Sequence, residues 1–172
     1  MARNLDIVKV VFLSEESKQG FIFVLNTWLY GMQKAEVFKT KPLLSRVILR
    51  NAQDFFVRIV EKLGIWKFKR GVTPIEAINE HIEVLERLGF ASRSNFVIEQ
   101  PTENNIVIKV INCPYRIACE EIMKEGHELA CPRAVVFGSS VKDFSGKYIS
   151  YRVEPLKDVR GVKQCTINMN VI

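Results

Sequence analysis

The sequence of 172 residues lacks the motifs that identify the common enzyme classes. It has no G-x-G-x-x-G or P-loop segment to hold a nucleotide phosphate and no G-x-S-x-G segment to present a nucleophilic serine. Its two histidines, His81 and His127, stand in charged surroundings where exposure is the default. His127 and Cys131 have the i, i+4 spacing at which a Cys-His pair can meet on a helix, but Pro132 disfavours a continuous helix there. We therefore expect a binding protein rather than an enzyme.

Long apolar runs are also missing. No run approaches the roughly eighteen residues of a membrane-spanning helix. Charged residues interrupt the first ten positions, unlike a secretory signal. These absences predict a cytoplasmic location and no membrane association. Thiols are reduced in that compartment, so metal binding or redox sensing is favoured over a disulfide framework for the four cysteines.

What the chain does have is a concentration of cysteine, with three of its four cysteines inside residues 113–131. Cys113 and Cys131 each precede a proline, which suits the first turn of a helix. A thiol at a helix N-terminus meets partial positive charge, so we expect a lowered pKa at both positions. Cys119 falls on the apolar face of the first helix, where a small core residue is the alternative interpretation.

The spacing of the four cysteines, C-x5-C-x11-C-x33-C, matches no compact zinc-finger pattern. Cys165 shares one face of an alternating strand with Ile167 and Met169. If that strand packs on the helices that carry the other thiols, Cys113, Cys119, Cys131 and Cys165 meet. The sequence therefore predicts a cluster that binds one zinc ion or acts as a redox-sensitive group of thiols.

Periodicity and turn residues divide the chain into helices and strands. We expect strands at residues 5–13, 96–99, 106–111, 147–154 and 163–171, and helices beginning near Ser14, Pro42, Pro74, Pro114 and Pro132. The helix over residues 42–63 shows a broad apolar stripe of Leu44, Val47, Ile48, Phe55, Ile59, Val60 and Leu63. This order predicts an α+β domain with a mainly antiparallel sheet of hairpins covered by helices.

Thr73 begins the most secure element. Thr73, Pro74 and Glu76 form a capping-box pattern, with proline at the first helical position. The helix and the hairpin after it also match the recognition helix and wing of a DNA-binding domain, and the net charge of +6 agrees. Glutamates 76, 80, 83 and 86 are expected on the solvent face of that helix, however, and carboxylates repel phosphate. A winged-helix regulator is therefore the alternative, with nucleic-acid binding disfavoured.

The run from Thr73 through Asn112-Cys113, the two helices that follow, Gly146, the strand to Glu154, Gly161 and Cys165 resembles the vinyl-4-reductase domain. This is a small-molecule-binding module of the superfamily that includes the transport-particle (TRAPP) subunits and the heme nitric-oxide binding domain. The resemblance covers residues 42–172. It implies a cavity for a small apolar ligand, for which we expect the lining residues Phe55, Phe56, Leu85 and Ile108.

The resemblance also implies a metal site. Sensor domains of phenol-responsive activators in that family bind zinc through a cysteine, a Glu-x-x-Cys pair and a final cysteine. Cys131, Glu154 and Cys165 match three of these positions, whereas Lys157 stands at the other. Cys113 or Cys119 would replace that ligand, as in an archaeal branch whose extra cysteines are linked to redox-responsive regulators. The overall expectation is a regulatory sensing domain with a cysteine-rich metal site.

Residues 1–41 precede the part that resembles the family and contain an aromatic helix. We expect the core of the domain that follows to be complete without Phe21, Phe23, Trp28 and Tyr30. Large aromatic side chains dominate the energetics of protein interfaces, so we expect this segment to form a homodimer. Packing into the core is the simpler alternative.

Overall fold

The computed structural model describes residues 15–34, 43–159 and 161–172. The strand expected at residues 5–13 lies outside these ranges. The helices are α1 (Glu15–Lys34), α2 (Leu43–Lys62), α3 (Pro74–Arg87), α4 (Arg116–Lys124) and α5 (Pro132–Ser145). The strands are β1 (Phe96–Thr102), β2 (Asn105–Ile111), β3 (Ile149–Val159) and β4 (Val162–Val171). No helix in the described ranges is long and apolar enough to cross a membrane.

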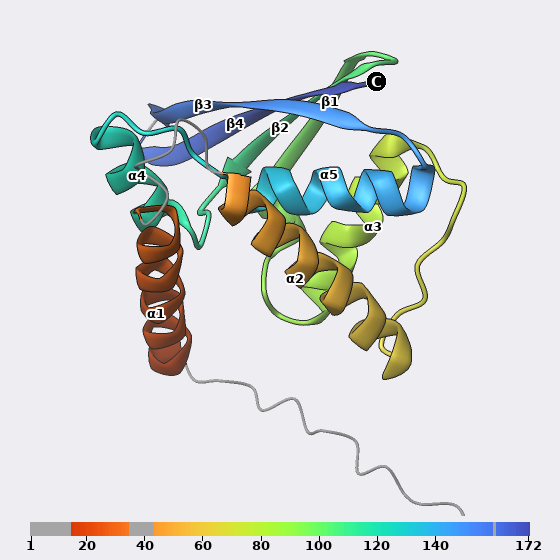
Figure 1. Cartoon of the computed structure of the whole chain (residues 1–172), viewed down its shortest axis with the longest axis horizontal. Coiled ribbons are helices and arrows are strands. Elements are labelled where there is room, and N and C mark those ends of the chain that lie inside the picture. The colour runs from red at the N-terminus through yellow and green to blue at the C-terminus, as the bar shows by residue number, and fades with distance from the viewer. Residues whose placement is uncertain (1–14, 35–42, 160) are drawn as a thin grey trace, which may run out of the picture.

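The strands form one sheet in the order β1-β2-β4-β3, and each neighbouring pair is antiparallel. Helices α2, α3 and α5 lie on one side of this sheet, and α1 packs against α4 at one end of the molecule (Figure 1). The predicted α+β class, with hairpins covered by helices, is therefore confirmed.

Alternation along the strands builds the core. On β2, Ile106, Ile108 and Val110 are buried, and their pairing with β4 places Ile167 and Met169 beside them. Phe137 and Phe144 of α5 belong to the same cluster of buried side chains. Helix α5 is thus held between the sheet and the outer helices α2 and α3, with which it is in contact.

Capping residues fix where the helices near the cysteines begin. Thr73 and Glu76 form the predicted capping box of α3. Cys131 is the N-cap of α5, as expected, and Pro132 is the first helical residue. Cys113 is different, because α4 begins only at Arg116 and the Arg116 N–H donates to the Cys113 carbonyl at 3.1 Å. Cys119 is buried on α4, as its periodicity predicted.

The expected apolar stripe of α2 is largely wrong. Leu44, Val47 and Phe55 are more than half exposed, whereas Ser45 and Gln53 are buried. The buried face of α2 includes Gln53 because this side chain donates a hydrogen bond to Ser140 of α5, at 3.2 Å. An apolar count does not reveal such a paired polar residue.

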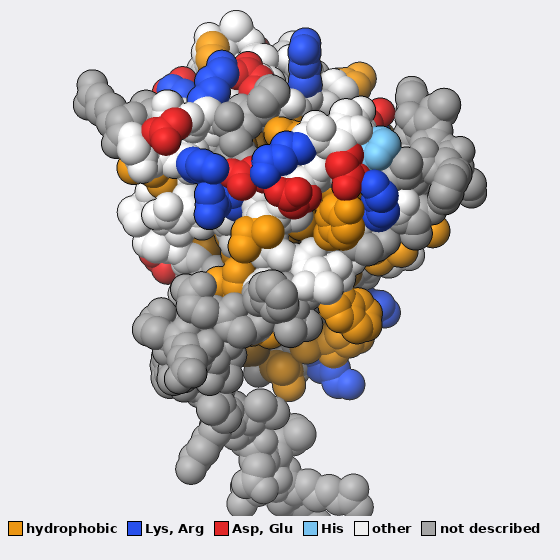
Figure 2. All heavy atoms as spheres, turned by 90° about the vertical axis from the view of Figure 1, so that its left-hand side faces the viewer, with side chains coloured by type: hydrophobic (Ala, Val, Ile, Leu, Met, Phe, Trp, Pro, Cys, Tyr) orange, Lys and Arg blue, Asp and Glu red, His pale blue; other side chains and the backbone are white. Residues whose placement is uncertain are grey.

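The winged-helix alternative receives no support from the fold. Half of the residues of α3 are buried, including Glu80, which was expected on the solvent face. The Glu80 carboxylate accepts hydrogen bonds from Trp66 Nε1 and from the Lys69 N–H. Strand β2 is paired on both edges inside the sheet, so the hairpin is no free wing. Figure 2 shows side chains of both charge signs intermingled on the face that carries α1 and α4.

Candidate functional site: two cavities at the start of helix α5

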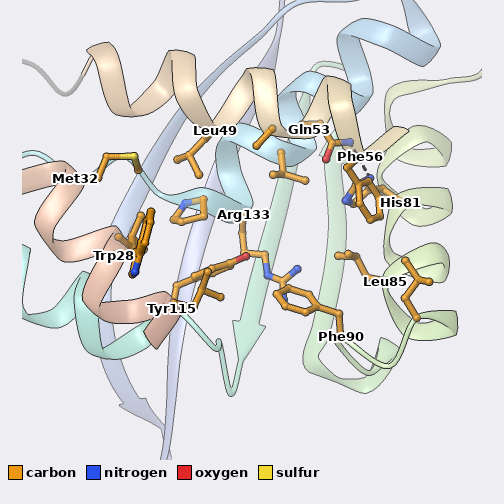
Figure 3. Close-up of a pocket in the computed structure, with 16 residues that line it drawn as sticks. Trp28, Met32, Leu49, Gln53, Phe56, His81, Leu85, Phe90, Tyr115 and Arg133 are labelled. Carbon is orange, nitrogen blue, oxygen red and sulfur yellow. Dashed lines mark hydrogen bonds between the residues drawn. The ribbon is translucent and has the colours of Figure 1, made fainter. Parts of the chain in front are cut away.

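The larger candidate site is a cavity of about 520 Å³ between α1, α2, α3 and the start of α5 (Figure 3). Most of its lining is apolar, and Trp28 and Met32 of α1 lie across it from Leu85 of α3. The full lining is Leu25, Trp28, Leu29, Met32, Leu49, Ala52, Gln53, Phe56, His81, Leu85, Leu88, Phe90, Tyr115, Pro132, Arg133 and Val136. Trp28 is 77% exposed, so the cavity is open beside α1.

A small polar network forms one part of the wall. Gln53 Nε2 and Ser140 Oγ lie 3.2 and 3.1 Å from His81 Nδ1. Burial, with the nearby Arg133 charge, lowers the pKa of His81 to about 3, so the ring is neutral at neutral pH. The histidine was expected to be exposed, and this expectation is wrong. The residues next to His81 in the sequence give no sign that its partners lie on α2 and α5.

Arg133 is the charged group of the cavity wall. It is 3% exposed, and its guanidinium lies 5.3, 5.3 and 5.6 Å from the ring centroids of Phe90, Phe96 and Tyr115. Its buried Nε has no hydrogen-bond partner, and no carboxylate in the described ranges forms an ion pair with it. Sequence reasoning missed this residue, since an arginine after a proline gives no sign of burial.

The four residues expected to line a ligand cavity are divided by the structure. Phe56 and Leu85 line it. Phe55 points away, is 58% exposed and lies under the guanidinium of Arg58. Ile108 is fully buried in the core against the sheet and is not part of the lining. Neighbouring positions on a helix differ by about 100° in direction, and of Phe55 and Phe56 only Phe56 lines the cavity.

The smaller candidate site is a cavity of about 20 Å³, room for one water-sized species. All five predicted metal-site residues contribute to its lining, which consists of Cys113, Arg116, Cys119, Met123, Leu129, Cys131, Val153, Glu154 and Cys165. The thiols come from the turn before α4, from α4 itself, from the start of α5 and from β4. All four are free thiols.

Burial raises the pKa of every thiol in this cluster. For Cys131 the pKa rises to about 12, and the backbone N–H groups at the start of α5 oppose this only in part. The expected lowering at Cys113 and Cys131 is therefore wrong, because desolvation outweighs the helix terminus. At neutral pH these thiols are protonated, a form that is neither nucleophilic nor ligating.

The thiols surround one void but are not arranged as a metal centre. Among the residues that the structure describes, no three His, Cys, Asp or Glu side chains are positioned to hold one ion. The Glu154 carboxylate is also engaged elsewhere. It accepts hydrogen bonds from Asn168 Nδ2 at 3.0 Å and from Lys157 Nζ at 3.3 Å.

Comparison with known proteins gives no family assignment. No family model and no curated protein match the chain. Three solved structures are similar at low identity. A Cs H-NOX mutant that contains 4-cyano-L-phenylalanine has 11% identity and a TM-score of 0.43, and the match covers 73% of this chain and 60% of that one. This chain thus spans less than two thirds of that protein.

The second structure comes from work on heme distortion in the H-NOX family, with 10% identity and a TM-score of 0.46. The third is a variant of Tt H-NOX, with 9% identity and a TM-score of 0.45. Both matches cover 92% of this chain and 72% of the other. TM-scores below 0.5 carry no functional conclusion, and the resemblance to the vinyl-4-reductase domain stays a prediction.

Proposed function

We propose that this protein is a regulatory binding domain that takes up a small, largely apolar molecule in the cavity between α1, α2, α3 and α5. The observation that supports this most is the cavity itself. Its volume of about 520 Å³ lies within the roughly 300 to 1,000 Å³ of small-molecule sites. Its lining has the character of such sites, with apolar walls and a few buried polar groups.

The position of α1 suggests how binding is sensed. Leu25, Trp28, Leu29 and Met32 of α1 line the cavity opposite residues of α2 and α3. A ligand in the cavity touches both sides and adds apolar contact between them. Binding therefore stabilises the docked position of α1, and a change in that position is the signal a partner protein reads.

The adjacent aromatics of α2 provide the test. Phe56 lines the cavity, whereas Phe55 is exposed. In titration calorimetry with a panel of apolar compounds, we expect Phe56→Ala to weaken binding about tenfold, as loss of a buried aromatic contact costs on the order of 1 to 2 kcal/mol. Phe55→Ala is the matched control and leaves affinity unchanged. Equal losses in both variants, or no binding to the wild-type chain, would refute the proposal.

We also propose a second function, zinc binding by the cysteine cluster. It is supported by the shared lining of one ion-sized void by Cys113, Cys119, Cys131 and Cys165. Thiolates are preferred zinc ligands, and a bound metal deprotonates thiols whose pKa is otherwise raised. For four thiols to surround an ion, their side chains would have to rotate from the positions described above.

The zinc proposal is tested by elemental analysis of protein purified without added metal or chelator. We expect about one zinc per chain, lost on chelation together with stability, because metal binding to a site that is absent from the unfolded chain adds to folding free energy. Zinc-free protein that takes up no added zinc would refute it. Rapid native-state oxidation of the thiols would then support the redox interpretation instead.

The expected homodimer is likewise a proposal. Phe21 and Trp28 of α1 are 51% and 77% exposed, which supports an apolar contact surface on this helix. Tyr30 instead donates a hydrogen bond to Glu125, directly after α4, at 2.7 Å, and the Phe23 side chain lies outside the described residues. We expect Phe21→Ser to shift a dimer to monomer in sedimentation without changing ligand affinity. A wild-type chain that sediments as a monomer would refute the dimer proposal.

A further inference from the structure

A buried cation without an anion is the least explained feature of the larger cavity. Arg133 is 3% exposed, and guanidinium stays charged at all physiological pH values. An uncompensated buried charge is costly, so buried charges are normally paired. The sixteen residues that line the cavity include no aspartate or glutamate. The guanidinium interacts with the neutral Cys113 thiol, but no carboxylate in the described ranges forms an ion pair with it.

The aromatic rings around Arg133 compensate it only in part. Phe90, Phe96 and Tyr115 place their rings within 5.6 Å of the guanidinium carbon. Such cation–π contacts stabilise the charge but accept none of the five in-plane N–H bonds. The arginine lines the cavity, where Figure 3 shows its side chain between Tyr115 and Phe90. The buried Nε of Arg133 lacks an acceptor, which a molecule bound in the cavity can supply.

We propose that the molecule bound in this cavity is an apolar monocarboxylate, such as a medium-chain fatty acid or a hydrophobic aromatic acid, and that Arg133 holds its carboxylate. This inference rests on the proposed binding function and specifies its ligand class. The planar fork of the guanidinium matches a carboxylate in a bidentate arrangement. The hydrocarbon part then contacts the apolar walls, including Leu49 and Leu85.

The charge count favours a carboxylate over a phosphate. Arg133 is the one arginine or lysine among the described lining residues. His81, the remaining basic group of the lining, is buried and neutral, so it adds no second positive charge. A phosphate monoester carries close to two negative charges at neutral pH and would be left partly uncompensated.

Matched ligands test this in the wild-type chain of 172 residues. Decanoate and decanol share an alkyl chain and differ in the charged group. We expect decanoate to bind at least about tenfold more tightly, the effect of charge-assisted hydrogen bonds. Arg133→Gln should remove this preference by weakening decanoate far more than decanol. Arg133→Lys retains the positive charge but not the planar guanidinium fork. This variant should keep only part of the preference for decanoate.

The outcomes separate this inference from the function on which it rests. Equal affinity of the wild-type chain for decanol and decanoate would overturn the carboxylate inference and leave the apolar binding function standing. Binding of neither compound, nor of any of the apolar panel, would overturn both. Decyl phosphate is the third ligand, and tighter binding of it than of decanoate would refute the argument from charge. Because these arms use the wild-type chain, the test survives if a variant fails to fold.

Discussion

The two cavities meet at the first residues of α5 but differ completely in character. Pro132 and Arg133 line the larger one, whereas the preceding residue, Cys131, lines the smaller one. The turn before α4 divides in the same way, because Tyr115 belongs to the larger cavity and Cys113 to the smaller. One is wide, apolar and carries a single unpaired cation. The other is the size of one ion and is bordered by four thiols.

This difference shows how one helix start serves two kinds of chemistry. The N-cap of α5, Cys131, lines the smaller cavity and its second helical residue, Arg133, lines the larger one, so each cavity receives one functional group from the same turn. Burial then acts on both. It keeps the thiols protonated and His81 neutral, but it cannot neutralise a guanidinium. Of the two cavities, the larger one is thus left with a positive charge, that of Arg133, which an anionic ligand can balance.

The largest expected effect is a dependence of folding stability on pH, which we expect from the larger cavity and not from the smaller one. The pKa of His81 is lowered to about 3, below its unfolded value of 6.5, so the unfolded chain binds more protons between these values. Stability is therefore present in full above about pH 6.5 and falls as pH falls, by about 1.4 kcal/mol per unit and roughly 5 kcal/mol in total. Urea unfolding at several pH values measures this loss.

Two variants control the pH experiment. His81→Gln removes the titrating ring, so its stability should fall less steeply with acid than that of the wild-type chain. Cys165→Ala is the counterpart in the smaller cavity, where burial raises the pKa far above this range, and its curve should run parallel to wild type. Parallel curves for His81→Gln and wild type would contradict the assignment of a neutral, buried His81.

The next largest effect comes from filling the larger cavity. Leu49 lines it from α2, so Leu49→Trp should reduce affinity for an apolar ligand about a hundredfold, equivalent to roughly 2.7 kcal/mol. Val47→Trp is the matched control, because Val47 is 53% exposed on the same helix. Calorimetry measures the affinities, and zinc content should be equal in both variants. If Val47→Trp also abolished binding, the cavity would not be the binding site.

A smaller effect is expected from the cysteine cavity. Cys119 is 7% exposed, so Cys119→Ala removes a buried sulfur and should cost on the order of 1 kcal/mol of unfolding free energy in metal-free protein. Affinity for an apolar ligand should not change. In zinc-loaded protein the loss of unfolding free energy should be larger, because the substitution also removes a zinc ligand. A drop in apolar-ligand affinity as large as that of Leu49→Trp would show that the two cavities are not separate.

Local signals in the sequence predict much of this architecture. The capping box at Thr73, the N-cap at Cys131 and the alternation of β2 and β4 each depend on residues close in the chain. The gathering of the four cysteines around one void also agrees with their positions on inward faces. These features follow from local geometry that repeats along the chain.

The larger cavity could be predicted only in part, because its polar groups have distant partners. Gln53 is buried on α2 because it contacts His81 and Ser140, which lie 28 and 87 residues further along the chain. Arg133 is buried under rings contributed by the segment before β1, β1 itself and the turn before α4. No periodic pattern contains such pairings. Apolar periodicity therefore misjudged which face of α2 packs inward, and with it the placement of Phe55.

The smallest expected effect concerns Glu154, the one carboxylate that borders the cysteine cavity. Its side chain is 38% exposed and its ion pair with Lys157 is a surface pair, which is worth little. Glu154→Gln should therefore change the unfolding free energy by less than about 0.5 kcal/mol in metal-free protein. Its carboxylate already accepts hydrogen bonds from Lys157 and Asn168, so zinc stoichiometry and affinity should also stay the same. A tenfold or larger loss of zinc affinity would make Glu154 a ligand and the cavity a mixed site of thiolates and carboxylate, which would bring its chemistry closer to that of the charged cavity beside it.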